Sequence, residues 1–158
     1  SQNTQFVFSD MSDFNYQKSD IINTPFVLGY IKSPKTILKL FQKFHSSLNK
    51  KGKIIGIIDA PKSNVHDNKM FGSVKTIETL KEGMKLKIDL YDNEKIVTLN
   101  AVYHTKETIE DLLSRAGFTT IKWHEPIISK AGIKIHGAKF WEKYLNNLDI
   151  AYFTAKKL

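Results

Sequence analysis

The sequence predicts an α/β fold organised around a helix that turns directly into a buried strand. Residues 37–48 carry apolar side chains at helical spacing, namely Ile37, Leu38, Leu40, Phe41, Phe44 and Leu48. Ser33 and Pro34 suit the first positions of this helix, and Gly52 after two lysines suits a left-handed C-cap. The run KIIGIID follows at once and is apolar on successive positions, which predicts a strand covered on both faces.

The preceding stretch, residues 20–28, reads as a second strand and completes a βαβ unit. Such units are right-handed, and ligands bind beyond the carboxyl ends of their strands. We therefore expect a site formed by the loop at residues 23–33 and by the segment after Ile58, where Asp59 ends the strand.

Length and composition are those of one globular domain. The chain has 158 residues, of which 41% are hydrophobic, enough for a substantial core. It has no cysteine, which excludes disulfides, thiolate metal sites and cysteine nucleophiles. No apolar run approaches 18 residues and no signal-peptide pattern is present, so we expect a cytoplasmic protein without a membrane span.

The net charge of +8 raises the question of nucleic-acid binding. Arg115 is the only arginine, and the lysines are spread out in runs no longer than two. Arginine is the usual bidentate reader of guanine and phosphate. A solvated lysine-rich surface is therefore the favoured interpretation, and a nucleic-acid partner is disfavoured.

The remaining elements follow from their patterns. Alternation of apolar and polar residues predicts an antiparallel meander over residues 73–104, inserted into the main domain. Thr105 and Gly117 bound a second amphipathic helix. Further strands are predicted at residues 5–8, 118–123 and 150–155, a short helix at 138–147, and a mobile polar connection at 61–68.

Taken in order, these pieces resemble the second half of a class I S-adenosylmethionine-dependent methyltransferase. The resemblance rests on the Lys-Lys-Gly turn and apolar strand, on YHTKETIEDLLSRAGFTTIKW, on AKFWEKYL and on the closing IAYFTAKK. It covers nearly the whole chain and is nearest to the small-molecule branch. It implies a Rossmann-like mixed sheet with an antiparallel last strand, S-adenosyl-L-methionine as cofactor, and methyl transfer to a small-molecule acceptor.

One defining element of that family is missing from this sequence. The glycine-rich loop after the first strand and the acidic residue ending the second have no counterpart, since Gly29 is the only glycine before Gly52. If residues 5–8 correspond to the third strand, the two strands that should separate them from residues 20–27 are absent. We therefore expect a C-terminal portion of the fold, whose N-terminal half is missing, disordered or supplied by a second chain.

The resemblance also assigns roles to individual residues of the cofactor site. Asp10 and Met11 match the contact to the adenine ring, although an aspartate capping a loop turn explains Asp10 equally well. Thr24, Pro25, Gly29 and Tyr30 match the loop along the methionine end of the cofactor. Gly29 permits close backbone approach, and Tyr30 offers a ring face to the sulfonium cation. Phe26 and Leu28 in the same loop are expected to be core residues.

Residues for the acceptor side are less sharply marked. His104, after Tyr103 at the end of a strand, is a candidate base facing the acceptor; the alternative is a surface or capping role. Trp123 and Trp141 are candidates to line the acceptor pocket, with simple packing as the alternative. His66, His124 and His136 lack metal-ligand spacing, so no metal site is expected.

Two functions from different classes follow. The first is a methyltransferase of which this chain is a fragment, inactive alone because half of the cofactor contacts are absent. The alternative is a non-catalytic module with the same fold that binds a protein partner through an exposed sheet edge.

Overall fold

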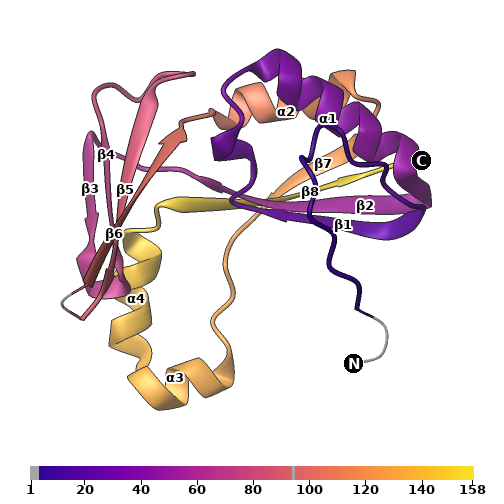
Figure 1. Ribbon diagram of the computed structural model, residues 1–158. Coiled ribbons are helices and arrows are strands. Elements are labelled where there is room, and N and C mark those ends of the chain that lie inside the picture. The colour runs from indigo at the N-terminus through magenta and orange to yellow at the C-terminus, as the bar shows by residue number, and fades with distance from the viewer. Residues whose placement is uncertain (1–3, 94) are drawn as a thin grey trace.

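The computed structural model describes residues 4–93 and 95–158, which form two four-stranded sheets with helices around them (Figure 1). The first sheet has the strand order β1 (Ser19–Pro25), β2 (Leu48–Asp59), β8 (Ile150–Lys156) and β7 (Thr119–His124). β1 and β2 are parallel, whereas β8 runs antiparallel to both of its neighbours, β2 and β7. The predicted mixed sheet, with its antiparallel last strand inserted beside the central one, is confirmed.

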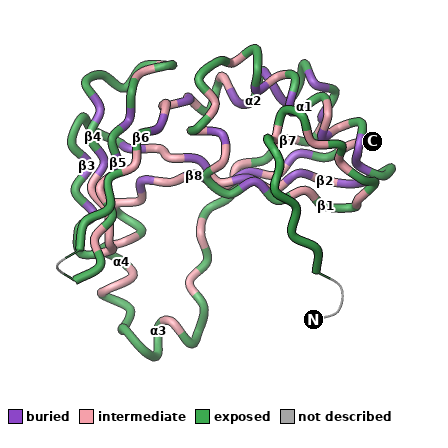
Figure 2. The backbone as a smooth tube through the Cα atoms, viewed as in Figure 1, coloured by how far each residue is buried: buried purple, intermediate pink, exposed green. Residues whose placement is uncertain are grey.

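Two helices cover one face of this sheet. α1 (Pro34–Ser47) and α2 (Lys106–Arg115) lie side by side above it in Figure 1. Their apolar stripes share one core with Leu48, Ile54 and Ile58 of β2 and with Ala151, Phe153 and Ala155 of β8. Figure 2 colours the buried stretches of the backbone purple. The core comprises Leu28, Ile37, Leu40, Phe41, Phe44, Leu48, Ile54, Ile58, Ile109, Leu112, Leu113, Ala116, Phe118, Ala151, Phe153 and Ala155.

The opposite face of the sheet corrects the expectation of a strand covered on both sides. In β2, Ile54 and Ile58 are fully or almost fully buried, but Ile55 and Ile57 on the other face are only partly buried. Ile21 of β1 is 52% exposed. Within the described residues the helices α1 and α2 cover only one face, so isoleucines on the second face remain in contact with solvent.

The turn between α1 and β2 also differs from the prediction. Ser33 is the N-cap of α1, as predicted, but the helix ends at Ser47 and its C-cap, Leu48, already has an extended backbone. Ser19 pairs with Leu48 and Ile21 with Lys53, so the chain bulges between these pairs. Lys51, not Gly52, has the positive φ of 65°. Gly52 is required for space, because a β carbon there would lie 2.9 Å from the Asn49 carbonyl oxygen.

The second sheet is the predicted meander, enlarged by one strand. Its order is β3 (Val65–Asn68), β4 (Ser73–Ile77), β5 (Lys85–Asp92) and β6 (Lys95–Val102), all antiparallel. The expectation of a polar connection at residues 61–68 is wrong for residues 65–68, which pair with β4 and become β3, whereas residues 61–64 form no helix or strand. Its small core contains Ile77, Leu86, Ile88 and Ala101.

This second sheet lies beyond the carboxyl ends of β1 and β2. The short helix η1 (Leu28–Tyr30) follows β1, and a β carbon on its Gly29 would lie 3.4 Å from Cβ of Ala101 in β6. A second short helix, η2 (Lys69–Phe71), joins β3 to β4. Parallel strands end at the same edge of a sheet, so this arrangement places the meander where ligands of α/β folds bind.

The C-terminal third carries two further helices on an extension from the sheet (Figure 1). α4 (Ala138–Asn146) was predicted, but α3 (Lys130–His136) was not, and neither contains a buried residue. Residues 5–8 do not form the predicted strand: Phe6 and Phe8 are almost fully exposed and have no strand partner among the described residues. None of the described helices combines the length and apolarity required to cross a membrane.

Candidate functional site

A pocket of about 340 Å³ opens between the two sheets, and we call it the inter-sheet pocket. It lies where β1 and β2 end, as predicted for the segment after Ile58. Mostly apolar and aromatic side chains line it. The lining residues are Phe26, Tyr30, Asp59, Asn68, Phe71, Gly72, Ser73, Lys75, Ile88, Leu90, Leu99, Tyr144, Asp149 and Ile150.

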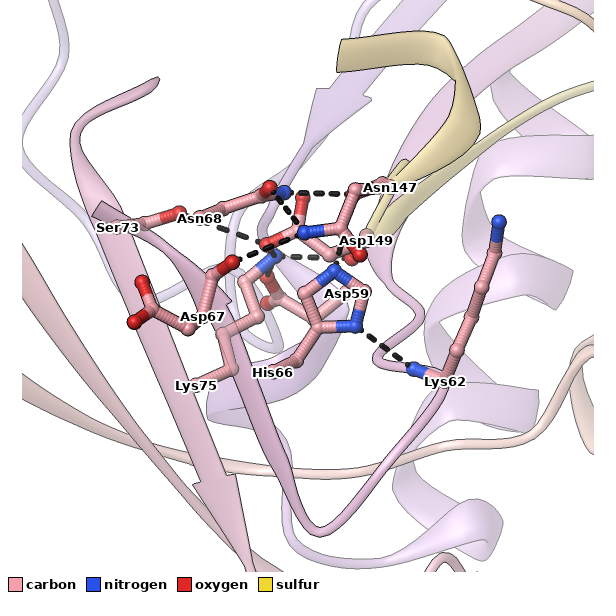
Figure 3. A network of polar contacts seen from close by, with 9 residues as sticks. All are labelled: Asp59, Lys62, His66, Asp67, Asn68, Ser73, Lys75, Asn147 and Asp149. Atoms are coloured by element: carbon pink, nitrogen blue, oxygen red, sulfur yellow. Dashed lines mark hydrogen bonds and ion pairs between the residues drawn. The ribbon is translucent and has the colours of Figure 1, made fainter. Parts of the chain in front are cut away.

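Three charged side chains that line this pocket, Lys75, Asp59 and Asp149, form a network of ion pairs (Figure 3). The ammonium of Lys75, from β4, lies 2.7 Å from Asp59 Oδ1 and 3.0 Å from Asp149 Oδ2. It also donates to the Asp149 carbonyl oxygen at 2.9 Å. The side chains of Lys75 and Asp149 are only 4% and 5% exposed. Lysine is almost never buried to this extent unless it is paired. The two aspartates therefore hold the Lys75 ammonium in place, and we call Lys75, Asp59 and Asp149 the triad.

A hydrogen-bonded layer behind the triad fixes β3 to the segment between α4 and β8. The Asn147 side chain donates to the carbonyl oxygen of Asp67 at 2.9 Å and to Asn68 Oδ1 at 2.7 Å. The Asn147 carbonyl oxygen accepts from Asn68 Nδ2 at 2.8 Å. His66 Nδ1 accepts from the Lys62 amide, so Nε2 carries the proton and donates to the Asn147 carbonyl oxygen at 2.9 Å.

Aromatic residues close the pocket on the side of α4. The rings of Phe71 and Tyr144 meet edge to face at 5.1 Å between centroids. Burial, followed by the proximity and hydrogen bond of Tyr152 and the charge of Asp149, raises the pKa of Tyr144 well above its ordinary value. Its phenol is therefore neutral at physiological pH. Phe26, which also lines the pocket, has a φ of 56°, a left-handed backbone conformation that is uncommon outside glycine.

A second hollow of about 290 Å³ brings together three of the predicted cofactor residues. Asp10, Met11 and Tyr30 line it, together with Ser12, Ile31, Lys32, Ser33, Thr36 and Leu40. We call it the Asp10 hollow. Asp10 Oδ1 accepts from the Ser12 hydroxyl at 2.5 Å and from its amide at 2.7 Å, and these bonds lower the pKa of Asp10. Asp10 therefore caps a turn, the alternative interpretation of this residue, and it also lines the hollow, where its contact to an adenine ring stays a prediction.

The other predicted cofactor residues lie at the end of β1. Thr24 is buried and its hydroxyl donates to the Ile55 carbonyl oxygen at 3.3 Å, so its side chain links β1 to β2 within the sheet. Pro25 pairs with Ile57 as the last residue of β1. Gly29 lies between β6 and Asp59, with its missing β carbon 3.9 Å from Asp59 Oδ2. Leu28 is a core residue as expected, but Phe26 is 41% exposed and lines the inter-sheet pocket.

His104 and Tyr103 do not line the inter-sheet pocket. They border a separate hollow of about 340 Å³, which also includes Lys106 and Glu107. His104 is buried, with Nδ1 2.6 Å from Glu82 Oε1 and Nε2 2.8 Å from the Ile31 carbonyl oxygen. Both ring nitrogens are thus engaged, which favours a structural role. Burial, and then the charges of Glu107 and Glu82, raises the pKa of Tyr103.

The two tryptophans lie apart from each other and from the inter-sheet pocket. Trp123 packs edge to face on Phe153 at 5.4 Å, and its indole nitrogen donates to Glu110 of α2. Trp141 lies in α4 and lines a shallow apolar hollow of about 480 Å³ on the α3–α4 extension. Its indole nitrogen is buried without a partner among the described residues. Packing, the alternative weighed for both residues, accounts for Trp123.

No protein-family model and no curated protein matches the sequence of this chain. Solved structures with a similar fold are found by comparison of the three-dimensional structure. An S-adenosylmethionine-dependent methyltransferase from Clostridium acetobutylicum superposes with a TM-score of 0.57 at 14% identity, covering 96% of this chain. Structures of S-adenosylmethionine-dependent methyltransferases from Mesorhizobium loti and Listeria monocytogenes each superpose with a TM-score of 0.59. Their sequence identities are 13% and 12%, and the superpositions cover 94% and 95% of this chain. The chain has the fold of S-adenosylmethionine-dependent methyltransferases. It spans 63% of the Clostridium protein, 68% of the Mesorhizobium protein and 67% of the Listeria protein.

Sequence reasoning missed Lys75, Asp149 and Tyr144, which dominate the inter-sheet pocket. A signal for Lys75 was present, because it shares a strand face with Ile77 two residues later and so occupies an inward position. No comparable signal marks Asp149 or Tyr144. Their partners are distant in sequence, as the separation of 74 residues between Lys75 and Asp149 illustrates.

Proposed function

We propose that this protein transfers a methyl group from S-adenosyl-L-methionine to a small-molecule acceptor. The observation that carries the proposal is the position of Tyr30, which lines both the Asp10 hollow and the inter-sheet pocket. A cofactor bound on the Asp10 side and an acceptor in the inter-sheet pocket would therefore meet at one side chain. Methyl transfer depends mainly on such positioning and on exclusion of water.

The residues around the Asp10 hollow fit one end of the cofactor. Ser12 occupies Asp10 Oδ1, which leaves the second carboxylate oxygen to accept a hydrogen bond from an adenine amino group. Met11 supplies an apolar surface for the ring, and Tyr30 lies towards the inter-sheet pocket. When bound, the cofactor supplies an electrophilic methyl group on a sulfonium. The chain's own part is to hold the adenine and to orient the acceptor beside Tyr30.

The inter-sheet pocket fits a small acceptor in size and lining. Its volume of about 340 Å³ falls at the lower end of the range for small-molecule sites. Ile88, Leu90 and Leu99 offer apolar contact, whereas Asp59 and Asn68 supply polar groups that fix orientation. We propose that the meander acts as the substrate-side cover of the site.

We also propose that a further segment or a second chain completes the cofactor site. Among the described residues β1 pairs only with β2, so its other edge carries free backbone groups. The face carrying Ile21, Ile55 and Ile57 is open beside that edge. An added strand would pair with the free edge of β1, and an added helix would cover the open face of the sheet. The turn between them would supply backbone amides for the remaining polar parts of the cofactor.

Calorimetric titration with S-adenosylhomocysteine tests the proposal on the 158-residue chain and on the longest available version of the protein. Each charge-linked hydrogen bond that is lacking costs about 1.5–3 kcal/mol, and each 1.4 kcal/mol weakens binding about tenfold. We expect millimolar or weaker binding and no turnover by the chain alone, with micromolar binding by the longer version. Tight binding by the isolated monomer would contradict the need for a further segment, and no binding by either would contradict the function.

A second candidate is a non-catalytic module that binds a protein partner, and the open edge of β1 favours it. The same titration separates the two functions. A longer version that folds and binds a partner chain, but has no measurable affinity for S-adenosylhomocysteine, would select the binding module.

A further inference from the structure

We propose that the inter-sheet pocket selects a ligand that carries an ammonium group on an apolar body, in other words a small amine. The inference rests on the proposed function only in treating this pocket as the acceptor site. It concerns the charge that the pocket recognises, not the atom that is methylated.

The charges that line the pocket are unbalanced. The carboxylate and ammonium groups among its lining residues are those of Asp59, Asp149 and Lys75, so two carboxylates face one ammonium. The chain as a whole carries +8. The pocket is therefore a locally acidic site on a basic protein, which attracts cations to a position where most of the surface repels them.

The single cation in the pocket has no capacity left for an anionic ligand. An ammonium has three N–H donors. Those of Lys75 face three oxygen atoms, namely Asp59 Oδ1 at 2.7 Å, the Asp149 carbonyl oxygen at 2.9 Å and Asp149 Oδ2 at 3.0 Å. A carboxylate or phosphate group would thus enter beside two carboxylates without a cationic donor to receive it, which is costly in a partly desolvated site.

Asp59 is the carboxylate that remains available to a ligand. It contacts Lys75 through Oδ1, whereas Oδ2 has no hydrogen-bond or ion-pair partner among the described residues and lies 3.9 Å from where a β carbon of Gly29 would stand. Its side chain is 11% exposed, against 5% for Asp149. An ammonium beside Oδ2 would gain a charge-assisted hydrogen bond and would restore neutrality to the pocket.

The aromatic lining suits the same ligand. Phe26, Tyr30, Phe71 and Tyr144 line the pocket, and aromatic ring faces attract cations most strongly where water is excluded. The raised pKa of Tyr144 keeps its phenol neutral, so this residue adds no further charge. Ile88, Leu90 and Leu99 on the meander side provide the surface for an apolar body.

Three probes of similar shape and different charge test the inference: 2-phenylethylamine, 2-phenylethanol and 3-phenylpropanoate, titrated at pH 7 into the chain without cofactor and followed by amide NMR shifts. We expect saturable shifts at Phe26, Phe71 and Tyr144, with the amine binding at least tenfold tighter than the alcohol and the carboxylate not binding. Equal or tighter binding of the carboxylate, or no saturable binding of any probe, would overturn the proposal.

Variants locate the effect in the pocket. Asp59→Asn keeps the shape and an oxygen acceptor for Lys75 but removes the charge, and should weaken amine binding at least tenfold without changing alcohol binding. Asp111→Asn, at an exposed aspartate on α2, is the matched control and should have no effect.

Should Asp59→Asn disturb the amide spectrum as a whole, Phe71→Leu takes its place and should lower amine affinity more than alcohol affinity. Unchanged amine binding in a folded Asp59→Asn or Phe71→Leu chain would refute the assignment. Because no cofactor is present, these results are independent of binding to S-adenosylhomocysteine.

Discussion

Lys75 Nζ lies 2.7 Å from Asp59 Oδ1, and this contact joins the meander to the carboxyl end of the central strand of the main sheet. Lys75 belongs to β4 of the second sheet, whereas Asp59 is the last residue of β2 in the first. The ion pair therefore holds together the two walls of the inter-sheet pocket. Its burial means that removing one partner leaves an uncompensated charge, which is more costly than losing the attraction itself.

Lys75→Met should accordingly destabilise the fold strongly. Methionine fills the space of the lysine stem but leaves Asp59 and Asp149 facing each other, and breaking a buried pair costs about 3–5 kcal/mol. Urea unfolding followed by circular dichroism measures this change. Lys87→Met is the control, because Lys87 is 52% exposed in its pair with Asp89 and should cost less than about 1 kcal/mol. Equal effects of the two substitutions would contradict the structural role of the triad.

Asn147→Ala should loosen β3 from the main domain. The Asn147 side chain satisfies the Asp67 carbonyl oxygen and Asn68 Oδ1, so its loss leaves a partly buried acceptor unpaired at a cost of about 1–3 kcal/mol. Hydrogen exchange should become faster at the amides of β3 and β4 and remain unchanged in α1. Asn146→Ala is the neighbouring control, since the exposed side chain of Asn146 makes no hydrogen bond among the described residues and Lys62 contacts only its backbone carbonyl oxygen. Identical exchange in both variants would show that the clamp is not needed.

Gly56→Ala should disrupt the centre of the main sheet. A β carbon at Gly56 would lie 2.2 Å from Phe153 Cζ, on the paired residue of β8, so the ring or the strands must shift. Overpacking of this kind costs about 1–3 kcal/mol or more. Shortening the partner in Gly56→Ala/Phe153→Leu should recover part of the loss relative to the sum of the single substitutions. Strict additivity in thermal unfolding would argue against this contact.

The pKa of His45 predicts a pH dependence of stability. Burial, and then the charge of Lys157, lowers the pKa of His45 below its ordinary value near 6.5. The unfolded chain then binds a proton more readily than the folded chain, so stability is full above about pH 6.5 and falls as the pH drops through the folded pKa. Urea midpoints between pH 7.5 and 5.5 should decrease more for the natural chain than for His45→Gln. His136→Gln, at an exposed histidine, should leave the slope unchanged; a slope insensitive to residue 45 would reject the assignment.

Tyr30→Ala should weaken ligand binding in both the Asp10 hollow and the inter-sheet pocket, because Tyr30 lines each of them. We expect at least tenfold weaker binding of S-adenosylhomocysteine to the longer version, together with weaker 2-phenylethylamine binding to the chain. Tyr91→Ala is the matched control, since Tyr91 lies on β5 outside both hollows with Lys69 over its ring. Loss of only one of the two affinities would show that the hollows are not joined at Tyr30.

Local patterns predicted most of the main sheet and its helices. The stripe of α1, the capped α2 and the apolar run of β2 each depend on residues within a few positions of one another, and all three elements formed, although α1 ends earlier than predicted and one face of β2 is open. The errors occur where a partner decides the outcome. Residues 5–8 have strand-like composition but no strand partner in the described chain, whereas the polar residues 65–68 became a strand because β4 pairs with them.

The sequence alone determined the helices α1 and α2, the strands of the main sheet and the faces of these elements that carry apolar side chains, because periodicity and capping act over one or two turns of chain. It also pointed to the ends of β1 and β2 as the place for a site. Only the tertiary structure decided that Asp10, Met11 and Tyr30 share one hollow and that Lys75 meets Asp59 and Asp149. Those contacts arise from the packing of two sheets, and a buried charge selects its partner by distance in space rather than by separation along the chain.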